Sequence, residues 1–157
     1  MKRENKPAGR SGRNWRIGII HSSFHNEEVA SLVAGARHHL AKAGVKSGNI
    51  TEYPAHGSFE VPLIGAALAE ARAVDALIGI GIIVEGETHH ARLLAESVVQ
   101  GMMDVQTRYR IPFAFEVLYV DSIELARERC RLPYNKGAEA AAAVLQTIAT
   151  LATLERS

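Results

Sequence analysis

The sequence contains one cysteine and almost no net charge. These two shortages argue against a disulfide-stabilised domain and against a protein that binds nucleic acid. The single cysteine, Cys130, cannot form an intramolecular disulfide, so a disulfide-stabilised domain is not expected. The formal net charge of +1 is too small for a protein that binds nucleic acid mainly by neutralising phosphates. We therefore expect no nucleic-acid partner.

Long hydrophobic runs are also missing from the sequence. No uninterrupted apolar stretch approaches the roughly 20 residues that span a bilayer. The opening segment has a basic start but lacks the apolar run that an export signal needs. We expect a cytoplasmic protein with no membrane role, and the lone Cys130 agrees with a reducing compartment.

Length and composition fit one globular domain. The chain has 157 residues, of which 47% are hydrophobic and 22% are charged, enough to bury a core without a disulfide or a structural metal. Residues 1–14 are rich in Lys, Arg, Gly and Asn, which predicts a disordered tail. The single domain is expected over residues 15–157.

Hydrophobic patterns predict strands that alternate with helices. Strands are expected at 15–22, 50–55, 75–84 and 113–120. Helices are expected at 26–43, 62–73, 90–110, 121–129 and 137–154. Asn26 is the expected cap of the first helix and Gly44 its stop.

This alternation indicates a mostly parallel sheet with helices on both faces. The nearly continuous apolar run at 75–84 is typical of a central strand covered on both sides. We therefore expect an α/β fold, a flavodoxin-like three-layer α/β/α sandwich with a four-stranded parallel sheet. In such sheets ligands bind at the carboxyl ends of the strands, so the loops after Ser22, Ala55, Val84 and Val120 should share one rim.

The loop Glu85-Gly86-Glu87-Thr88-His89-His90 follows the predicted central strand and opens a helix. Backbone N–H groups at a helix start favour an anion such as phosphate, and the Thr88 hydroxyl could add a donor. His90 can give and take a proton near neutral pH. A histidine in the first turn of a helix is also often a solvated polar residue, so both interpretations stay open.

Other polar residues near the rim also have two interpretations. Glu60 either caps the helix that follows it or accepts hydrogen bonds from a polyol or from ring N–H groups. Arg127, Arg129 and Lys136 either form a solvated helix face or bind an anion.

Metal and nucleotide sites have weak sequence support. Histidines 21, 25, 56, 89 and 90 suggest a metal site, but adjacent His89 and His90 do not share a helical face and no HExxH or cysteine pattern supports them. The GIG of the central strand lacks the third glycine of a dinucleotide fingerprint. We expect neither a metal nor another cofactor.

Several motifs occur together in an order and spacing that resemble lumazine synthase. They are FHNEEV, GSFEVPL, DALIGIGIIVEGETHH, IPFAFEVL and NKGAEAA, and the likeness runs from Ile17 to the last helix. GMMDVQ in the long helix is similar to the divergent second type of the family. The resemblance implies an enzyme of riboflavin biosynthesis.

The resemblance assigns one set of residues to the pyrimidine substrate. It implies an aromatic ring at Phe24 that stacks on the pyrimidine. It also implies a set that holds the ribityl chain and surrounds the ring: Ser58, Phe59, Glu60, Ile83 and Val84.

A second set is assigned to the phosphate and to catalysis. By similarity, Glu87 and Thr88 hold the butanone phosphate through backbone N–H groups, and Arg129 offers a guanidinium suited to phosphate. His90 matches the catalytic histidine of the family. Three further residues match positions that line the site: Phe115, often supplied by an adjacent subunit, Asn135 and Lys136.

The implied reaction condenses 5-amino-6-(D-ribitylamino)uracil with 3,4-dihydroxy-2-butanone 4-phosphate to 6,7-dimethyl-8-ribityllumazine, with loss of phosphate and water. No redox step occurs, so no cofactor is required. The family builds its sites between the subunits of a pentamer, so a homopentamer or a multiple of it is expected.

Some residues depart from the pattern of the family. Glu85 stands where arginine is common, Ala91 where an aromatic is common, and Glu116 replaces a usual glycine. Glu85 and Glu87 make the phosphate loop acidic, which should weaken anion binding unless Arg129 compensates.

Other functions stay open at this point. The main alternative is a non-catalytic paralogue that binds flavin or lumazine. A pentameric riboflavin synthase of archaeal type and a monomeric flavodoxin-like binding module are the others, and the EGETHH loop argues against the former.

Overall fold

The computed structural model describes residues 14–155, which form four strands, five α-helices and two short 3-10 helices. The predicted disordered tail lies outside the described residues, apart from its last residue. The strands are β1 (Ile17–Ser22), β2 (Ile50–Ala55), β3 (Ala76–Val84) and β4 (Phe113–Val120). The helices are α1 (Asn26–Lys42), η1 (Ser47–Asn49), η2 (Ser58–Glu60), α2 (Val61–Glu70), α3 (His90–Tyr109), α4 (Ile123–Cys130) and α5 (Lys136–Leu154).

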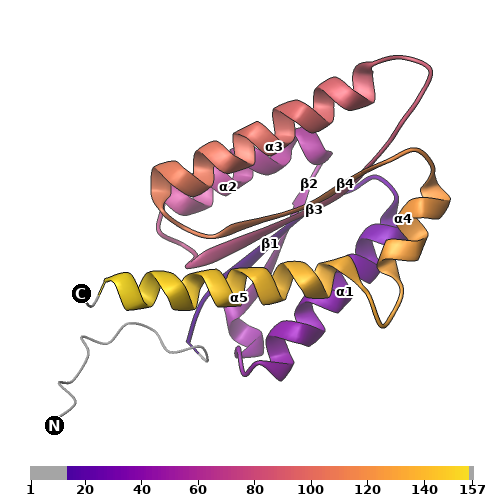
Figure 1. Cartoon of the computed structure of the whole chain (residues 1–157). Helices are drawn as coiled ribbons and strands as arrows, with labels where there is room; N and C mark the ends of the chain where they lie inside the picture. The colour runs from indigo at the N-terminus through magenta and orange to yellow at the C-terminus, as the bar shows by residue number, and fades with distance from the viewer. Residues whose placement is uncertain (1–13, 156–157) are drawn as a thin grey trace, which may run out of the picture.

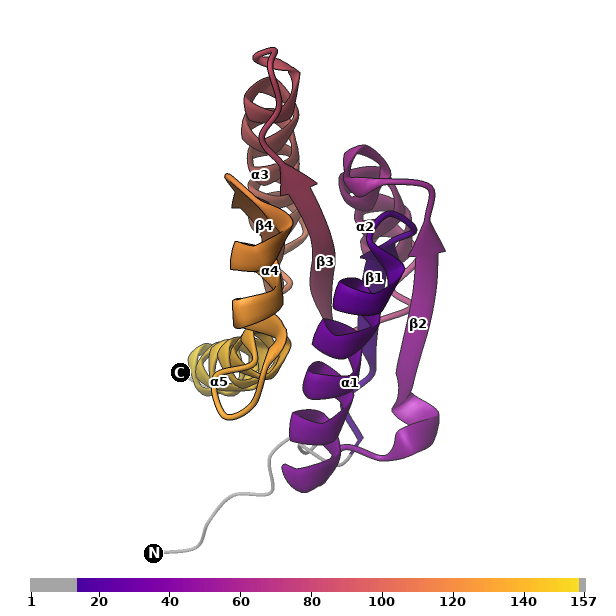
Figure 2. The same cartoon turned by 90° about the vertical axis from the view of Figure 1, so that its right-hand side faces the viewer.

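All four strands are parallel and lie in the order β2-β1-β3-β4. Helices α2 and α3 cover one face of the sheet, and α1, α4 and α5 cover the other (Figure 1). Figure 2 shows the four strand arrows running the same way, with β3 inside the sheet and β4 at one edge. The three-layer parallel sandwich and the central position of residues 75–84 are confirmed.

Each face of the sheet carries its own hydrophobic core, because neighbouring strand residues point to opposite faces. Ile78 and Ile80 of β3 pack with Leu32, Leu40 and other buried residues on the side of α1 and α5. Leu77 of β3 packs with Met102 of α3 and other buried residues on the side of α2 and α3. The strand therefore needs apolar side chains in both directions, which explains its unbroken hydrophobic run.

The ends of the helices follow local rules, with one exception. Gly44 adopts φ 94°, a left-handed conformation that ends α1 and that residues with a Cβ rarely adopt. The Ser122 hydroxyl accepts a hydrogen bond from Leu125 N at the start of α4. The cap predicted at Asn26 is wrong, because Asn26 is the first helical residue and His25 takes the cap position with φ 54°.

Helix α5 is the described segment that bears most directly on the expectation about membrane-spanning runs. Within the described residues it is the one helix long and apolar enough to cross a membrane by length and composition, with a mean hydropathy of 1.3. In the fold it packs against α1 and the sheet through five buried residues, which are Gly137, Ala140, Ala141, Val144 and Ile148. A helix that covers a core can pass the same test, so this property is weak evidence for a membrane span.

Candidate active site

A cavity of about 570 Å³ opens where the carboxyl ends of β1, β2 and β3 meet the start of α3. Its walls are largely apolar, with polar groups supplied by the loops. The sequence-predicted site residues that line it are Phe24, Ser58, Phe59, Glu60, Ile83, Val84 and His90. Three separate loops are thus brought together at one rim, as parallel-sheet geometry requires.

Phe24 is held at the mouth of the cavity by the turn that follows β1. The buried Ser22 hydroxyl accepts a hydrogen bond from Phe24 N at 3.1 Å, and Ser23 Oγ donates to Ala55 O at 2.6 Å. The Phe24 ring meets His56 edge to face, with 5.6 Å between ring centroids, and is 55% exposed. A largely exposed ring on a fixed backbone is available to stack against a planar ligand.

The segment from Gly57 to Glu60 lies directly on β3. Gly81 makes this approach possible, because a Cβ there would collide with the hydroxyl of Ser58. Gly57 N donates to Glu60 Oε2 at 3.0 Å, so this carboxylate fixes its own loop while it lines the cavity. Both interpretations of Glu60 are therefore compatible with the structure, since its other oxygen remains available to a ligand.

His90 begins α3 and lines the same cavity as the Gly57–Glu60 segment. The Thr88 hydroxyl accepts from His90 N at 3.4 Å, a long contact that nevertheless orients the first turn of the helix. Glu87, Thr88 and His90 are exposed. The imidazole is thus placed where it can exchange protons with a bound molecule and with water.

The remaining predicted site residues lie away from this cavity in the single chain. Glu87 and Thr88 are on the loop above it, outside its lining. Phe115 lies on the edge strand β4 and is 42% exposed. Arg129 lies in the last turn of α4, where its Nη1 donates to Leu125 O at 2.8 Å.

Asn135 and Lys136 stand at the start of α5. Asn135 is 4% exposed, and its side chain is used to cap that helix. Lys136 Nζ lies 2.6 Å from Glu139 Oε2 and also faces the charges of Glu116 and Arg129. The structure therefore gathers Arg129, Lys136 and Glu116 around the β4 edge, apart from the cavity.

Charge is distributed unevenly between these two regions. Among the described residues, no lysine or arginine lines the cavity, and Glu85 and Glu87 lie on the adjoining loop. Near the β4 edge, burial raises the pKa of Glu116 to about 7, with Lys136 acting to lower it and Glu139 to raise it. Burial also raises the pKa of Cys130 to about 11, so this thiol is a poor nucleophile at neutral pH.

Several residues that line the cavity were not predicted as substrate-binding or catalytic residues, although His25 and His56 had been considered as metal ligands. They are His25, His56, Gly57, Ile82, Ala91, Leu93, Leu94 and Ser97. Leu94 and Ser97 could have been predicted from the sequence, because they follow His90 at helical spacing and so lie on the same face of the helix. Within residues 14–155, no three His, Cys, Asp or Glu side chains converge in a way that could hold a metal ion.

Comparison with known proteins gives a consistent family. Residues 14–152 match the sequence model of the family described as 6,7-dimethyl-8-ribityllumazine synthase. A curated 6,7-dimethyl-8-ribityllumazine synthase of Deinococcus deserti is 33% identical over 143 residues, which cover 90% of this chain and 92% of the relative. Among solved structures, a de novo designed Rossmann fold protein matches 72% of this chain and 91% of its own, at 16% identity and a TM-score of 0.36.

Proposed function

The chain belongs to the 6,7-dimethyl-8-ribityllumazine synthase family, and we propose that the reaction of that family takes place in the cavity at the carboxyl ends of β1, β2 and β3. The reaction condenses 5-amino-6-(D-ribitylamino)uracil with 3,4-dihydroxy-2-butanone 4-phosphate in riboflavin biosynthesis. The observation that carries the proposal is the meeting of Phe24, the Ser58–Glu60 segment and His90 around one cavity.

In this proposal the pyrimidine binds against Phe24, whose exposed ring offers a stacking surface. Ile83 and Val84 give the ring an apolar wall, and the Ser58 hydroxyl and Glu60 carboxylate hydrogen-bond the ribityl chain and ring N–H groups. Phe59 also lines the cavity and is 65% exposed, so its ring is accessible to the bound pyrimidine. These contacts fix the orientation of the reacting amine.

His90 moves the protons of the reaction. The pyrimidine amine attacks the ketone of the butanone phosphate, and loss of water gives an imine. Phosphate then leaves, and the second amine closes the ring with loss of another water. A neutral imidazole accepts a proton from the attacking amine, and its protonated form donates to the departing oxygen. Holding both substrates together supplies much of the remaining acceleration.

A phosphate ester at this site needs a cation that the cavity does not contain. Backbone N–H groups around Glu87 and Thr88 give a partial positive charge, but the two glutamates of the loop oppose it. Arg129 and Lys136 lie near the β4 edge of the same chain. We propose that these two cations, with Phe115, reach the cavity of an adjacent copy.

This arrangement joins two different surfaces of the chain, which is the geometry of a closed ring. One surface surrounds the cavity mouth and exposes Phe59, Leu63 and Leu93; the other exposes Phe115 and Tyr119 on β4. Both surfaces expose several large apolar side chains, and exposed apolar patches are typical of protein–protein contacts. They support a closed ring of copies, and membership of the family makes a homopentamer, or a multiple of it, the assembly that we propose.

Turnover measured with His90→Ala tests the proposal. Purified protein is mixed with both substrates, and lumazine absorbance and released phosphate are followed at substrate concentrations from below to above KM. We expect kcat to fall about 100-fold in the variant with KM for each substrate changed less than threefold. His89→Ala is the matched control, because His89 is its neighbour but does not line the cavity. Equal turnover in His90→Ala and the unmodified protein would refute the role of His90.

A further inference from the structure

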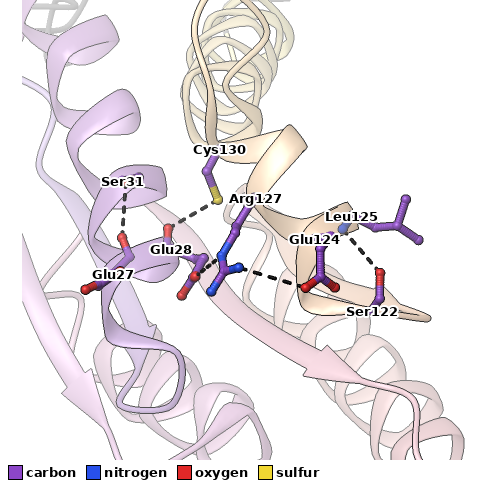
Figure 3. A network of polar contacts seen from close by, with 8 residues as sticks. All are labelled: Glu27, Glu28, Ser31, Ser122, Glu124, Leu125, Arg127 and Cys130. Atoms are coloured by element: carbon purple, nitrogen blue, oxygen red, sulfur yellow. Dashed lines mark hydrogen bonds and ion pairs between the residues drawn. The ribbon is translucent and has the colours of Figure 1, made fainter.

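One face of α1 contacts α4 and the connection between α4 and α5. We call this face the support face; its residues follow helical spacing and are Glu28, Ser31, Leu32 and Gly35. Figure 3 shows Arg127 and Cys130 of α4 directed at Glu28. Arg127 Nε donates to Glu28 Oε1 at 2.9 Å, and Cys130 Sγ donates to Glu28 O at 3.4 Å.

Glu28 is an unusual residue for this position, because it is a buried carboxylate on the inner side of a helix. The residue is 8% exposed, and the hydrogen bond from Arg127 holds the pKa of Glu28 below its ordinary value. Glu28 is therefore ionised at neutral pH and depends on Arg127 for its partner. Arg127 in turn forms a weaker contact, 3.9 Å, with Glu124 in its own helix.

Asn135 makes the second connection to the support face. Its Nδ2 donates to Ser31 O at 3.0 Å and to Cys130 O at 2.7 Å, and its Oδ1 accepts from Ala138 N at 3.1 Å. These three bonds use both donors of the amide and occupy its oxygen, so little remains for a ligand. Gly35 leaves room for this amide, because a Cβ at residue 35 would collide with Asn135 Oδ1.

The close approach continues at Gly137, where a Cβ would collide with Leu32 O on the support face. Residues 127, 130, 135 and 137 are thus all fixed to one face of α1. Arg129 and Lys136 lie between these fixed points, and within residues 14–155 neither forms a hydrogen bond or an ion pair with α1. The positions of Arg129 and Lys136 therefore depend on the neighbouring residues that contact α1, which are residues 127, 130, 135 and 137.

We propose that Glu28 and Asn135 are positioning residues of the phosphate-binding part of the site: through the support face of α1 they fix the α4–α5 connection that presents Arg129 and Lys136 to the adjacent copy. The inference rests on the proposed function, in which these two cations bind the butanone phosphate. It gives Asn135 a role different from the direct substrate contact that the family resemblance implies.

The test is steady-state kinetics of Glu28→Gln and Arg127→Gln, with both substrates varied in turn. Loss of the ion pair displaces α4 but leaves the cavity in place, so KM for the butanone phosphate should rise about tenfold. The kcat and the KM for the pyrimidine should change less than twofold. Glu28→Gln leaves only the 49% exposed Arg127 side chain without its partner, so it gives a folded protein even if Arg127→Gln, which leaves a buried carboxylate unpaired, does not.

Glu52→Gln is the matched control, because it removes an ion pair of similar length, 3.0 Å to Arg37, at the other edge of the sheet. Glu52→Gln should leave kcat and the KM for each of the two substrates unchanged. A general loss of kcat and both affinities in Glu28→Gln and Arg127→Gln would overturn the inference in favour of a merely structural role.

Arg129→Ala in the same assay separates this inference from the proposed function. If Arg129→Ala raises KM for the butanone phosphate but neither Glu28→Gln nor Arg127→Gln does, the positioning role is wrong and the proposed site stands. If Arg129→Ala also leaves this KM unchanged, the phosphate-binding role of Arg129 fails, and the positioning role fails with it.

Discussion

Replacing Glu116 by glutamine should make the protein more stable at high pH and remove a pH dependence of folding. Glu116 stands on β4 on the same side as Ala114 and Leu118, which pack against the core beneath α5. Burial raises its pKa to about 7 from an ordinary value of 4.5. The folded chain therefore prefers the protonated carboxyl, and ionisation of this group opposes folding.

The sign and size of the effect follow from proton linkage. Between pH 4.5 and about 7 the unfolded chain has lost the proton and the folded chain retains it, so stability falls as pH rises through this window. The full pKa difference is worth about 3 kcal/mol, and water around the half-buried carboxyl lowers the expected effect to about 1 to 2 kcal/mol. Glutamine matches the protonated form in size and does not titrate.

Urea unfolding at about pH 5 and about pH 8 measures this difference, at one fixed protein concentration because the proposed association would contribute to apparent stability. Glu116→Gln should match the unmodified protein at the lower pH and exceed it by about 1 to 2 kcal/mol at the higher pH. Glu96→Gln, which removes an exposed ion pair to Arg92, should change stability by less than about 0.5 kcal/mol at both. An equal difference at both pH values for Glu116→Gln would refute the reasoning.

Three further predictions concern packing and binding. Gly137→Ala should lower the free energy of unfolding by about 3 kcal/mol, because the new Cβ collides with Leu32 O, whereas Gly48→Ala meets nothing within 4 Å and should change it by less than about 0.5 kcal/mol; urea unfolding compares the two. Met102→Ala should cost about 2 to 4 kcal/mol by the same measurement, because Met102 is 1% exposed in the core beneath α3, and a smaller loss than in an exposed Met103→Ala control would contradict this. Phe24→Ala should raise KM for the pyrimidine about tenfold in steady-state assays without changing the unfolding midpoint, and an unchanged KM would exclude stacking on this ring.

The strands could be predicted from hydrophobic patterns because the pattern of each strand reflects how much of it is buried. Strand β3 is buried almost throughout, whereas β2 is partly exposed. Strand β2 was predicted with its observed bounds, and β3 differs by one residue at its start. Periodicity fixes the body of a helix better than its ends. It extended the second helix to residue 73, whereas α2 ends at Glu70 and Arg72 follows with φ 52°.

Local geometry explains what the patterns missed. Three-residue helices such as η1 and η2 are too short to give a periodic signal. The predicted helix start at Asn26 agrees with the structure, but the cap does not: asparagine is a favoured cap, whereas the tight turn after β1 puts His25 at the cap position in a left-handed conformation. That turn also directs Phe24 into the cavity mouth.

The candidate site was predictable where it depends on topology. Parallel strands bring their carboxyl ends together, so the Ser58–Glu60 segment and His90 had to meet. The part of the proposed site near β4 could not be predicted from the meeting of strand ends, since Phe115 and Lys136 lie outside the cavity of their own chain. Asn135 also had a second signal, its place before a long helical run, and the structure uses it as that cap.

The central claim is that one active site combines His90 of one copy with Arg129 of the next, and complementation between inactive variants tests it most directly. His90→Ala and Arg129→Ala chains are unfolded together in equal amounts and refolded, and turnover is compared with the two variants refolded separately. In a mixed ring about a quarter of the sites regain both side chains, so activity should return to about a quarter of that of the unmodified protein. Activity in the mixed sample no higher than the average of the separate variants would contradict the shared site.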